Sequence, residues 1–557
     1  MLFVFSIGWS NYTPYLAKEI IGNTLKKCSI KTRVIDLNNY FFNELLYRAD
    51  YYIQNSNAKF NIIEQIEILT SSECIDNFDA FLLAKENVNQ FLLNYSKLDK
   101  TMEISLDGIA FIGVTDNIYK VNLDDILDYV VNERSILLNR FFLNDLIMDF
   151  LNEDIVAFSV TSLGQFVTTL YLSNILRKRT KKIKIIMGGN YLSRIYDGIV
   201  EDGRVFELVD YLVKGCGEEI LPLLYGHIKT HQGALGDIPN IAYFDSERKM
   251  IVKNYLEHKE TFHESAFGVE NCKVNYYLPK KVVPMYITRG CAWKKCAFCS
   301  IPNISGRFRI RSITDVISDI KQYVKYGVIH FSFIDEALTP FLMSRLSDEI
   351  QNEKLNIRWG ALARFDGALD LELCKKIYAA GCRRLQFGLE SYNEDVLLKM
   401  NKGIDYKEVK NVIQHCIQCG ISINLFCMIG FPGETEQEAR KTVEFVLGIV
   451  EEALRKYGIL VTADFSAFLL DVNSNVYYNQ KQYGIVSEPV SDTRVSLYTQ
   501  YQPVSFDKNA VVYDAEQRYS KIIYDYFGQG DFEVREPLYI SETYWFLKAC
   551  QMENSKQ

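Results

Sequence analysis

Short apolar runs alternate with amphipathic segments through the first 230 residues of the chain. The apolar runs at 2–7 and 32–37 predict strands, and the amphipathic stretch at 15–28 predicts a helix between them. Residues 39–150 are rich in Asn, Leu, Phe and Tyr and have a mostly helical pattern, with a candidate hairpin at 108–121. This region therefore predicts a helical insert within an α/β unit.

A clearer alternation follows up to residue 230. Buried strands are predicted at 154–160, 182–189 and 210–215, and helices at 165–180 and 218–228. Strands and helices at this spacing predict a parallel, doubly wound, Rossmann-like sheet. Ligands of such sheets bind outside the carboxyl ends of the strands, and small and polar residues occupy those ends here.

The strand–helix alternation restarts at Val283, after a predicted linker at 231–282 that holds a short β-like stretch. Six strand–helix units between 283 and 475 fall short of the eight of a closed TIM-type barrel, so an open partial (β/α)6 barrel is predicted. Residues 476–557 lose the alternation and contain many tyrosines. They predict a small C-terminal cap that could shape a substrate pocket.

Composition narrows the class of protein. Apolar residues make up 48% and charged residues 24% of the 557 residues, as in folded globular proteins. Neither a secretory signal nor an uninterrupted apolar stretch long enough to span a bilayer is recognised, so a cytoplasmic location without membrane contact is expected. The formal net charge of −8 gives no broad electrostatic reason to bind nucleic acid.

Three of the thirteen cysteines lie within "RGCAWKKCAFCS". Cys291, Cys296 and Cys299 follow the first predicted barrel strand directly, at the mouth where barrel chemistry is placed. Thiolates suit zinc or an iron–sulfur cluster. A structural zinc site needs a fourth Cys or His, and none of the six histidines forms a suitable pair nearby. Three ligands on a four-iron cluster would leave one iron open, whereas free thiols on a loop are the simpler alternative.

The segment "TRGCAWKKCAFCS" resembles the cluster loop of radical SAM enzymes, including the aromatic Phe298 before the last cysteine. The resemblance implies that the three cysteines hold a [4Fe–4S] cluster, whose open iron binds the amino and carboxylate groups of S-adenosylmethionine (SAM). The usual first spacer of that family has three residues, whereas this loop has four, "AWKK". We expect the extra residue to form a local bulge that leaves the ligand count intact.

Four later strand ends resemble further motifs of the same family: "FSFIDEALTP", "GALARFD", "RLQFGLESYNEDVLLKMNKG" and "LFCMIGFPGETEQE". The resemblance implies one pair that faces the bound amino acid, one arginine near the SAM carboxylate, one pair near the ribose and carboxylate, and a glycine segment that approaches the adenine. In that order, the candidate residues are Asp335 and Glu336, Arg364, Glu390 and Ser391, and Gly430, Pro432 and Gly433. Any single strand-end carboxylate is as often merely solvated, so the ordered set carries the argument.

Other cysteines have a structural interpretation. The segment "HCIQCG", with Cys416 and Cys419, has the spacing of a redox or metal motif but falls at the end of an amphipathic helix. Cys374, Cys382 and Cys427 lie in apolar patterns and are expected in the core.

The N-terminal region resembles the cobalamin-binding domain that precedes the barrel in one radical SAM subclass, of which the class B methyltransferases are an example. The segments that carry this resemblance are "DIVAFSVTSLGQF", "IIMGGN" and "DYLVKGCGEE". No histidine precedes His227, so cobalamin would bind without a protein histidine on cobalt. The candidate cobalamin-contacting residues are Ser159, Thr161, Ser162, Gln165, Gly188, Gly189, Gly215 and Glu218. A domain that keeps this fold and has lost the cofactor is the alternative.

The combined resemblance implies reductive cleavage of SAM to a 5′-deoxyadenosyl radical and cobalamin-dependent C-methylation of a peptide or small natural product, with a flavodoxin- or ferredoxin-type reductant. A radical SAM epimerase or ring-forming enzyme, and a non-catalytic sensor of cobalamin or a cluster, remain alternatives. A tRNA methylthiotransferase would need a second cysteine triad, and the widely spaced Cys28, Cys74, Cys216 and Cys272 do not supply one.

Overall fold

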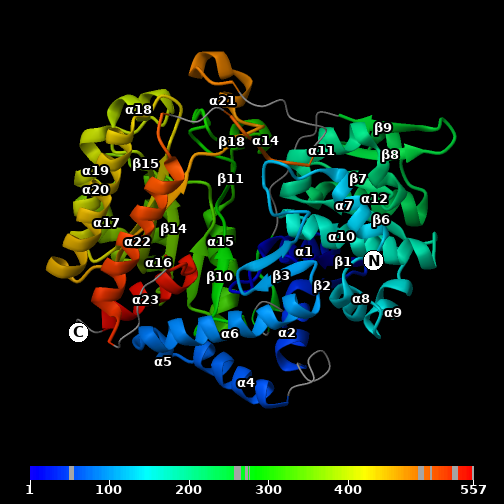
Figure 1. The fold of residues 1–557 in the computed structure, drawn as a ribbon, viewed down its shortest axis with the longest axis horizontal. Helices are drawn as coiled ribbons and strands as arrows, with labels where there is room; N and C mark the ends of the chain where they lie inside the picture. The colour runs from blue at the N-terminus through cyan, green and yellow to red at the C-terminus, as the bar shows by residue number, and fades with distance from the viewer. Residues whose placement is uncertain are drawn as a thin grey trace. The chain divides into compact units, whose positions relative to one another are not determined.

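The structure is a computed structural model that describes residues 1–48, 56–255, 265–269, 272, 274, 276–486, 495–501, 505–529 and 537–554, with only the backbone of 56–60. The chain divides into two compact units. Unit 1 comprises residues 1–67, 84–268 and 490–497, and unit 2 comprises 68–83, 269–489 and 498–557. Each unit contains a mainly parallel sheet, which confirms the predicted α/β class (Figure 1).

The sheet of unit 1 has seven strands in the order β2-β1-β5-β6-β7-β8-β9. Its strands are β1 (Leu2–Phe5), β2 (Arg33–Asp36), β5 (Ile155–Ser159), β6 (Lys184–Gly188), β7 (Tyr211–Val213), β8 (Ile241–Asp245) and β9 (Met250–Asn254). The first five strands are parallel, in the order of a doubly wound fold whose topological switch point lies between β1 and β5. Strands β8 and β9 extend the sheet antiparallel, so part of the segment predicted as a linker belongs to unit 1.

Helices cover both faces of this sheet. Those that follow its strands are α1 (Leu16–Lys27), α2 (Leu37–Tyr47), α10 (Leu163–Arg179), α11 (Asn190–Asp202) and α12 (Gly217–Thr230). On one face, α1 and α12 bury apolar side chains such as Leu25 and Leu224 against Phe3, Ala157 and Ile186 of the strands. The stretch of α10 from Gly164 to Asn174 is buried around its whole circumference, which indicates packing on both sides.

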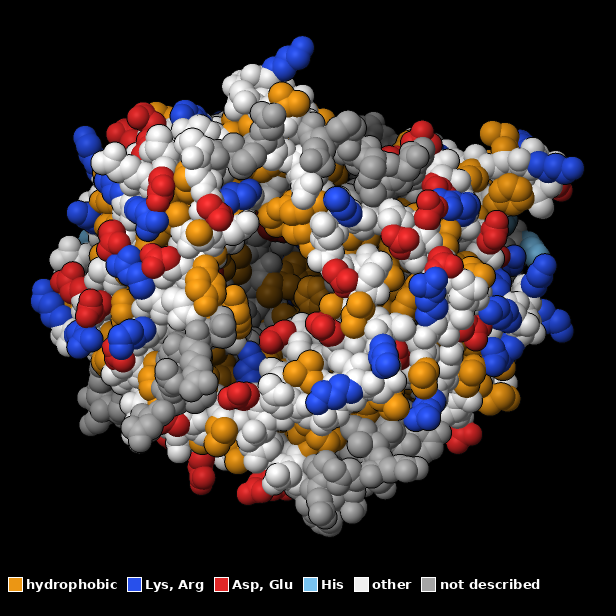
Figure 2. Space-filling model, viewed as in Figure 1, with side chains coloured by type: hydrophobic (Ala, Val, Ile, Leu, Met, Phe, Trp, Pro, Cys, Tyr) orange, Lys and Arg blue, Asp and Glu red, His pale blue; other side chains and the backbone are white. Residues whose placement is uncertain are grey.

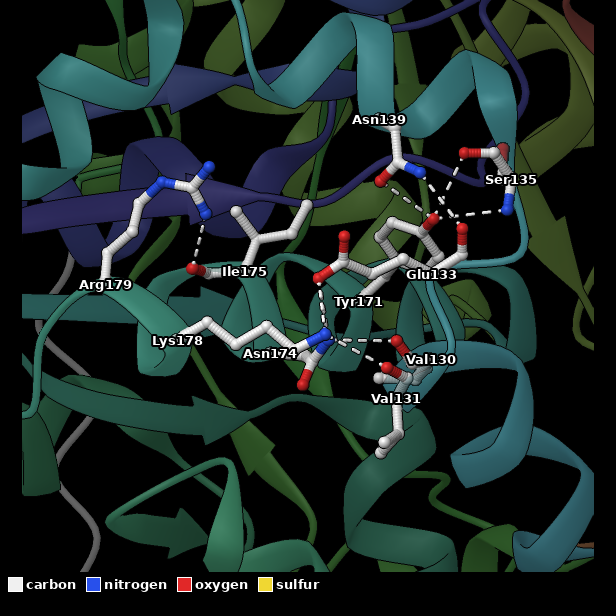
Figure 3. Close-up of polar contacts among 10 residues, drawn as sticks. All are labelled: Val130, Val131, Glu133, Ser135, Asn139, Tyr171, Asn174, Ile175, Lys178 and Arg179. Atoms are coloured by element: carbon white, nitrogen blue, oxygen red, sulfur yellow. Dashed lines mark hydrogen bonds and ion pairs between the residues drawn. The ribbon is translucent and has the colours of Figure 1, made fainter.

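The predicted helical insert packs against α10 (Figure 3). Its elements are α4 (Ser56–Thr70), α6 (Phe78–Leu98), β3 (Met102–Ser105), β4 (Gly108–Phe111), α7 (Leu123–Val131), α8 (Ile136–Phe142) and α9 (Leu146–Leu151). The amide of Asn174 donates to the carbonyl of Val130, and the hydroxyl of Tyr171 donates to the carbonyl of Ser135. The hairpin predicted at 108–121 was misplaced: it spans 102–111, because the turn between β3 and β4 lies at Leu106–Asp107.

Six parallel strands form the sheet of unit 2, in the order β10-β13-β14-β15-β16-β17. They are β10 (Val282–Met285), β13 (His330–Phe333), β14 (Arg358–Ala363), β15 (Cys382–Glu390), β16 (Ser422–Ile429) and β17 (Val461–Ala467). Each is followed by helical structure, as in α15 (Ile313–Lys325), α16 (Pro340–Asn352), α17 (Leu371–Ala379), α18 (Glu394–Lys399), α19 (Tyr406–Gln418), α20 (Glu436–Glu452) and α22 (Lys508–Phe527). The two edge strands, β10 and β17, do not pair with each other, so the barrel is open as predicted.

The last described helix, α23 (Glu542–Asn554), lies at the amino ends of the barrel strands. Glu553 accepts hydrogen bonds from Arg358 and Arg383, at 2.9 and 2.8 Å, and Glu542 pairs with Arg384. All three arginines lie at or next to strand starts. The C-terminal segment predicted as a cap therefore contributes the floor of the barrel, opposite its mouth.

Surface charge agrees with the low net charge. Acidic and basic side chains are interspersed on the face shown in Figure 2, without an extended patch of one sign. Among the described residues, no helix has the length and apolar character needed to cross a membrane.

Candidate functional site

The cluster loop, residues 291–299, leaves the carboxyl end of β10 and is held by its own backbone. Ala297, between two of the cysteines, donates its N–H to the carbonyl of Met400 at 2.8 Å. Its carbonyl accepts from the N–H of Val476 at 2.9 Å. Because the backbone N–H and the carbonyl of Ala297 are both hydrogen-bonded, the loop is fixed to the segment at Met400, after β15, and to the segment at Val476, after β17.

The three cysteines of this loop are close enough for their charges to interact. The charges of Cys291 and Cys296 both raise the pKa of Cys299, with burial as the largest cause. The described residues include no group of three His, Cys, Asp or Glu side chains placed to hold a single metal ion. A four-iron cluster is larger than one ion, so its thiolates need not converge on a single point.

The extra spacer residue is accommodated by a left-handed turn. Lys294 has a φ of +53°, a conformation that non-glycine residues rarely adopt. Its side chain donates to the carbonyl of Gly306. This is the local bulge expected from "AWKK", and it lies between Cys291 and Cys296.

Two cations lie against the loop. Arg364, after β14, places Nη1 4.0 Å from Sγ of Cys296, and its guanidinium lies 4.7 Å from the Trp293 ring. The ammonium group of Lys402 lies 5.7 Å from the ring of Phe298. Burial raises the pKa of Cys296, whereas the charges of Lys402 and Arg364 act in the opposite direction. The two cations therefore offset part of the effect of burial on the Cys296 thiolate.

Glu390, at the end of β15, forms a buried ion pair with Lys402. The Nζ–Oε1 distance is 2.6 Å, and both side chains are about nine-tenths buried. Glu390 has a φ of +64°, where the register between β15 and β16 shifts. Strained backbone of this kind collects at functional sites. Lys402 was not predicted, because a lone lysine after a helix carries no sequence signal that separates it from a solvated one.

Asp335 is buried and hydrogen-bonded to the segment that follows β10. Its Oδ1 accepts from the N–H of Ile287 at 3.0 Å and from Oγ1 of Thr288 at 2.6 Å. The side chain is 1% exposed, and burial raises its pKa to about 6. Asp335 thus ties the end of β13 to the end of β10 below the cluster loop. Glu336, the next residue, is exposed, and its charge acts on Cys299.

The glycine segment after β16 closes around a carboxylate that was not predicted. Oε2 of Glu434 accepts from the N–H of Gly430 at 2.6 Å, and burial raises the pKa of Glu434 to about 7. Pro432 is buried, while Gly433 is exposed and accepts from Lys399 through its carbonyl. Glu434 was not predicted because, in sequence, it looks like an ordinary acidic residue near the start of a helix.

Ser391 is fully buried and does not face the open mouth. Its hydroxyl lies 3.3 Å from that of Thr442 on α20. It is therefore placed to support the neighbouring Glu390 and the glycine segment rather than to reach a ligand directly.

In unit 1, the side chains at the switch point are hydrogen-bonded to one another. Gln165 is fully buried, donates to the carbonyl of Ser6, and accepts from Oγ1 of Thr161 at 2.8 Å. Ser162 caps α10 and donates to the carbonyl of Gly8. These contacts hold the ends of β1 and β5 together, so the polar atoms predicted for cobalamin also shape the loop.

The glycines at this edge differ in kind. A Cβ on Gly189 would lie 2.3 Å from the carbonyl oxygen of Val160, so the residue is needed for close packing of loops. Gly188 faces Val213, whereas a Cβ on Gly215 would meet nothing within 4 Å. Ser159 and Glu218 are buried. Open space at this edge therefore lies beside Gly215.

The cysteines interpreted as structural are placed as expected. Cys374, Cys382, Cys416 and Cys427 are buried, and Cys419 is half-buried at the end of α19. Burial raises the pKa of Cys382 and Cys427.

The geometry places a three-cysteine loop, two cations and a glycine segment at one end of a parallel sheet. Residues 285–446 match the family model described as the radical SAM superfamily. Unit 2 contains a radical SAM domain. The matched residues run from the end of β10 into α20 and include the cysteine loop.

Curated relatives match part of the chain. The ribosomal protein uS12 methylthiotransferase RimO of Porphyromonas gingivalis is 27% identical over 231 residues, which are 39% of this chain and 50% of RimO. The bacteriochlorophyllide d C-12(1)-methyltransferase of Chlorobaculum tepidum is 26% identical over 174 residues, 30% of this chain and 38% of that protein. The chain thus spans about half the length, or less, of these relatives.

Solved structures share the fold over the whole chain. The radical SAM methyltransferase TsrM of Kitasatospora setae, with cobalamin and a [4Fe-4S] cluster bound, has a TM-score of 0.59 at 14% identity, and the alignment covers 100% of this chain and 99% of TsrM. The cobalamin-dependent radical enzyme OxsB has a TM-score of 0.58 at 11% identity, with coverage of 94% and 66%. The chain therefore shares its fold with TsrM and OxsB over most of its length.

Proposed function

We propose that this chain is a radical SAM enzyme that uses a [4Fe–4S] cluster, SAM and cobalamin to methylate a carbon atom of a peptide or natural-product substrate. The observation that carries the proposal is the cysteine loop at the mouth of a radical SAM domain, in a chain whose fold matches TsrM from end to end. When bound, the cofactors would supply the methyl group, one electron drawn from an external reductant, and the deoxyadenosyl group of SAM as acceptor of the displaced hydrogen, so that a substrate carbon exchanges a hydrogen for a methyl group.

Cys291, Cys296 and Cys299 would hold the cluster. Three thiolates leave one iron open for the amino acid part of SAM. The loop fits this role, because its backbone is fixed at Ala297 and a basic side chain lies against Cys296.

The neighbouring residues would position SAM. Arg364 and Lys402 would balance the charge of its carboxylate, and Glu390 would keep Lys402 oriented through their buried ion pair. Glu336 is exposed beside Cys299, where it would accept a hydrogen bond from the SAM amino group. The backbone at Gly430 and Gly433 would approach the adenine, with Phe431 packed behind it.

Cobalamin would bind at the carboxyl edge of the unit 1 sheet. The edge fits a large planar ligand where Gly215 leaves open space, while Gly189 lets the neighbouring loops pack closely beneath it. With no histidine before His227, the corrin would be held without a protein imidazole on cobalt. Thr161, Ser162 and Gln165 would act mainly by shaping the loop.

Methylthio transfer, suggested by the likeness to RimO, has less support. In the described part of unit 1 and its neighbouring segments, Cys28 is exposed and Cys74 is buried, and they lie far apart in sequence from Cys216. A radical SAM epimerase or ring-forming enzyme is the second candidate, because it would share the barrel and its motifs.

Anaerobic reconstitution with iron, sulfide and hydroxocobalamin tests the proposal. We expect the absorbance of a four-iron cluster, retention of one corrin per chain, and SAM cleavage under reducing conditions. Cys291→Ala should lose the cluster, whereas Cys419→Ala, at the end of α19, should keep it. Absence of a cluster would refute the whole proposal, and SAM cleavage without corrin retention would refute only the methyl transfer.

A further inference from the structure

The spacer "AWKK" of the cluster loop carries two lysines that the proposed function does not use. Lys294 holds the left-handed bulge at a φ of +53°, a conformation that glycine or asparagine adopts at lower cost. Lys295 is exposed, and its ammonium group lies 4.9 Å from the ring of Trp293. The bulge therefore places two consecutive cationic side chains at the surface of the cluster loop.

Two further cations border this loop. Nζ of Lys294 donates to the carbonyl of Gly306, which is followed by the exposed Arg307. Lys399, exposed at the end of α18, is followed by Met400, whose carbonyl accepts from the backbone of the cluster loop. The four side chains form a group that we call the cationic rim: Lys294, Lys295, Arg307 and Lys399.

No ion pair neutralises the cationic rim in the described part of the chain. The ammonium groups of Lys294 and Lys399 donate to backbone carbonyls instead. The acidic residues of α18, Glu394 and Asp395, lie in its first turn, one turn away from Lys399. Exposed cations that lie close together without counter-charges repel one another, so the rim is suited to a partner with an acidic surface.

Apolar side chains accompany these cations, and the cysteines lie close beneath them. Leu398 is 71% exposed, and Trp293, in the spacer itself, is half-buried. Nε1 of Trp293 donates to the carbonyl of Asn401 at 2.9 Å, which fixes the ring against the segment after α18. Cys291 and Cys299 are themselves only half-buried. A cluster held by these thiolates would therefore lie just beneath the surface that the rim borders.

We infer that the cationic rim docks a flavodoxin-type electron carrier, an inference that rests on the proposed function because it needs the cluster. In the step that docking serves, the carrier is oxidised by one electron and the cluster is reduced by one, while no atom is transferred. A flavodoxin exposes the edge of its flavin within an acidic surface, which complements apolar side chains bordered by cations. Electron transfer slows steeply with distance, so a carrier docked above half-buried cysteines has a short path. Encounter complexes of this kind are small and are guided by charge.

Isothermal titration of the reconstituted full chain with a bacterial flavodoxin is the direct test. We expect saturable binding that weakens roughly tenfold when sodium chloride rises from about 20 to about 200 mM, because salt screens exposed charges. The double variant Lys295→Glu with Lys399→Glu should weaken binding at low salt by roughly tenfold or more. The matched control is Lys325→Glu with Lys354→Glu, which makes the same change in charge at exposed positions shortly before β13 and β14, at the amino ends of the barrel strands. The control should bind as the wild type does.

A comparison of two reductants separates docking from the later chemistry. SAM cleavage is measured with photoreduced flavodoxin and with reduced methyl viologen, a small cation that needs no docking surface. The ratio of the flavodoxin rate to the methyl viologen rate should fall roughly tenfold in Lys295→Glu with Lys399→Glu and stay unchanged in the control. Arg307→Glu, which lies outside the cluster loop, should lower the ratio several-fold and provides the test if the double variant fails to assemble its cluster.

The outcomes distinguish the inference from the proposed function. SAM cleavage with methyl viologen but no binding of flavodoxin would overturn the inference and leave the proposed function standing. Equal affinity for flavodoxin in the rim variants and the wild type, or an equal loss in the control, would overturn the inference as well. Tighter binding of a plant-type ferredoxin than of flavodoxin would overturn the choice of carrier. Absence of SAM cleavage with both reductants would refute the proposed function, and the inference with it.

Discussion

Replacement of Asp335 by Asn tests the electrostatic account of the barrel mouth. The carboxyl group is 1% exposed, and burial raises its pKa from 3.8 to about 6. Because the folded state holds the proton of Asp335 more tightly than the unfolded state, the stability contribution of this group is fully present below the unfolded pKa of 3.8. The contribution is lost as pH rises through the folded pKa of about 6. The shift corresponds to ~3 kcal/mol, at 1.36 kcal/mol for each pKa unit.

The Asp335→Asn side chain would keep the acceptor for Ile287 and Thr288 but would not ionise. The free energy of unfolding of Asp335→Asn minus that of wild type should therefore increase by ~3 kcal/mol between pH 3.5 and pH 7. Urea unfolding followed by tryptophan fluorescence measures this difference in the chain without cofactors. In a Trp9→Phe background, the remaining tryptophans, at 293, 359 and 545, all report on unit 2.

A difference for Asp335→Asn that is flat with pH, or that decreases as pH rises, would refute the assignment of a buried, proton-binding carboxyl group.

Three further substitutions test separate contacts, each by the midpoint of urea unfolding. Gly189→Ala should lower the free energy of unfolding of unit 1 by ~2 kcal/mol or more, because the new Cβ would overpack at a positive φ. Gly215→Ala is the control: its Cβ has open space, so it should lower the free energy of unfolding by only ~1 kcal/mol. Equal losses for the two variants would contradict the close packing at Gly189. Glu553→Ala leaves the 5% exposed Arg383 without its carboxylate and should cost ~3 kcal/mol, so a neutral result would show that the floor contact is not stabilising. Thr435→Ala removes a complete capping box from α20 and should cost ~1 kcal/mol, which an unchanged midpoint would disprove.

Much of the fold follows from local patterns. The six barrel strands are buried apolar runs such as 423–430, and the structure has a strand at each predicted place. The three cysteines could be located because their spacing has no ordinary structural use. Other parts depend on contacts between distant residues, which no local pattern encodes. Lys402 becomes a candidate only through its buried partner Glu390, and the hydrogen bond between Thr288 and Asp335 joins residues 47 positions apart.

The extent of unit 1 and the floor of the barrel were missed for the same reason. In sequence, β8 and β9 read as part of a linker, and only the antiparallel pairing of β8 with β7 and of β9 with β8 shows that they belong to the sheet of unit 1. Arg383 and Arg384 look solvated at a strand start, although their carboxylate partners come from α23, more than 150 residues later in the chain.

The position of α23 has a consequence for how the protein is made. Ribosomes release the chain from its amino end, so residues 285–446, with every candidate ligand of the cluster and SAM, emerge well before Glu542. During that interval Arg383 and Arg384 have no carboxylate to face, and the barrel has no floor. A transcript cut short ahead of α23 would thus encode all the ligands yet yield an unfinished barrel. Completion of translation, rather than emergence of the cysteines, is therefore the step that completes the barrel beneath the cluster loop.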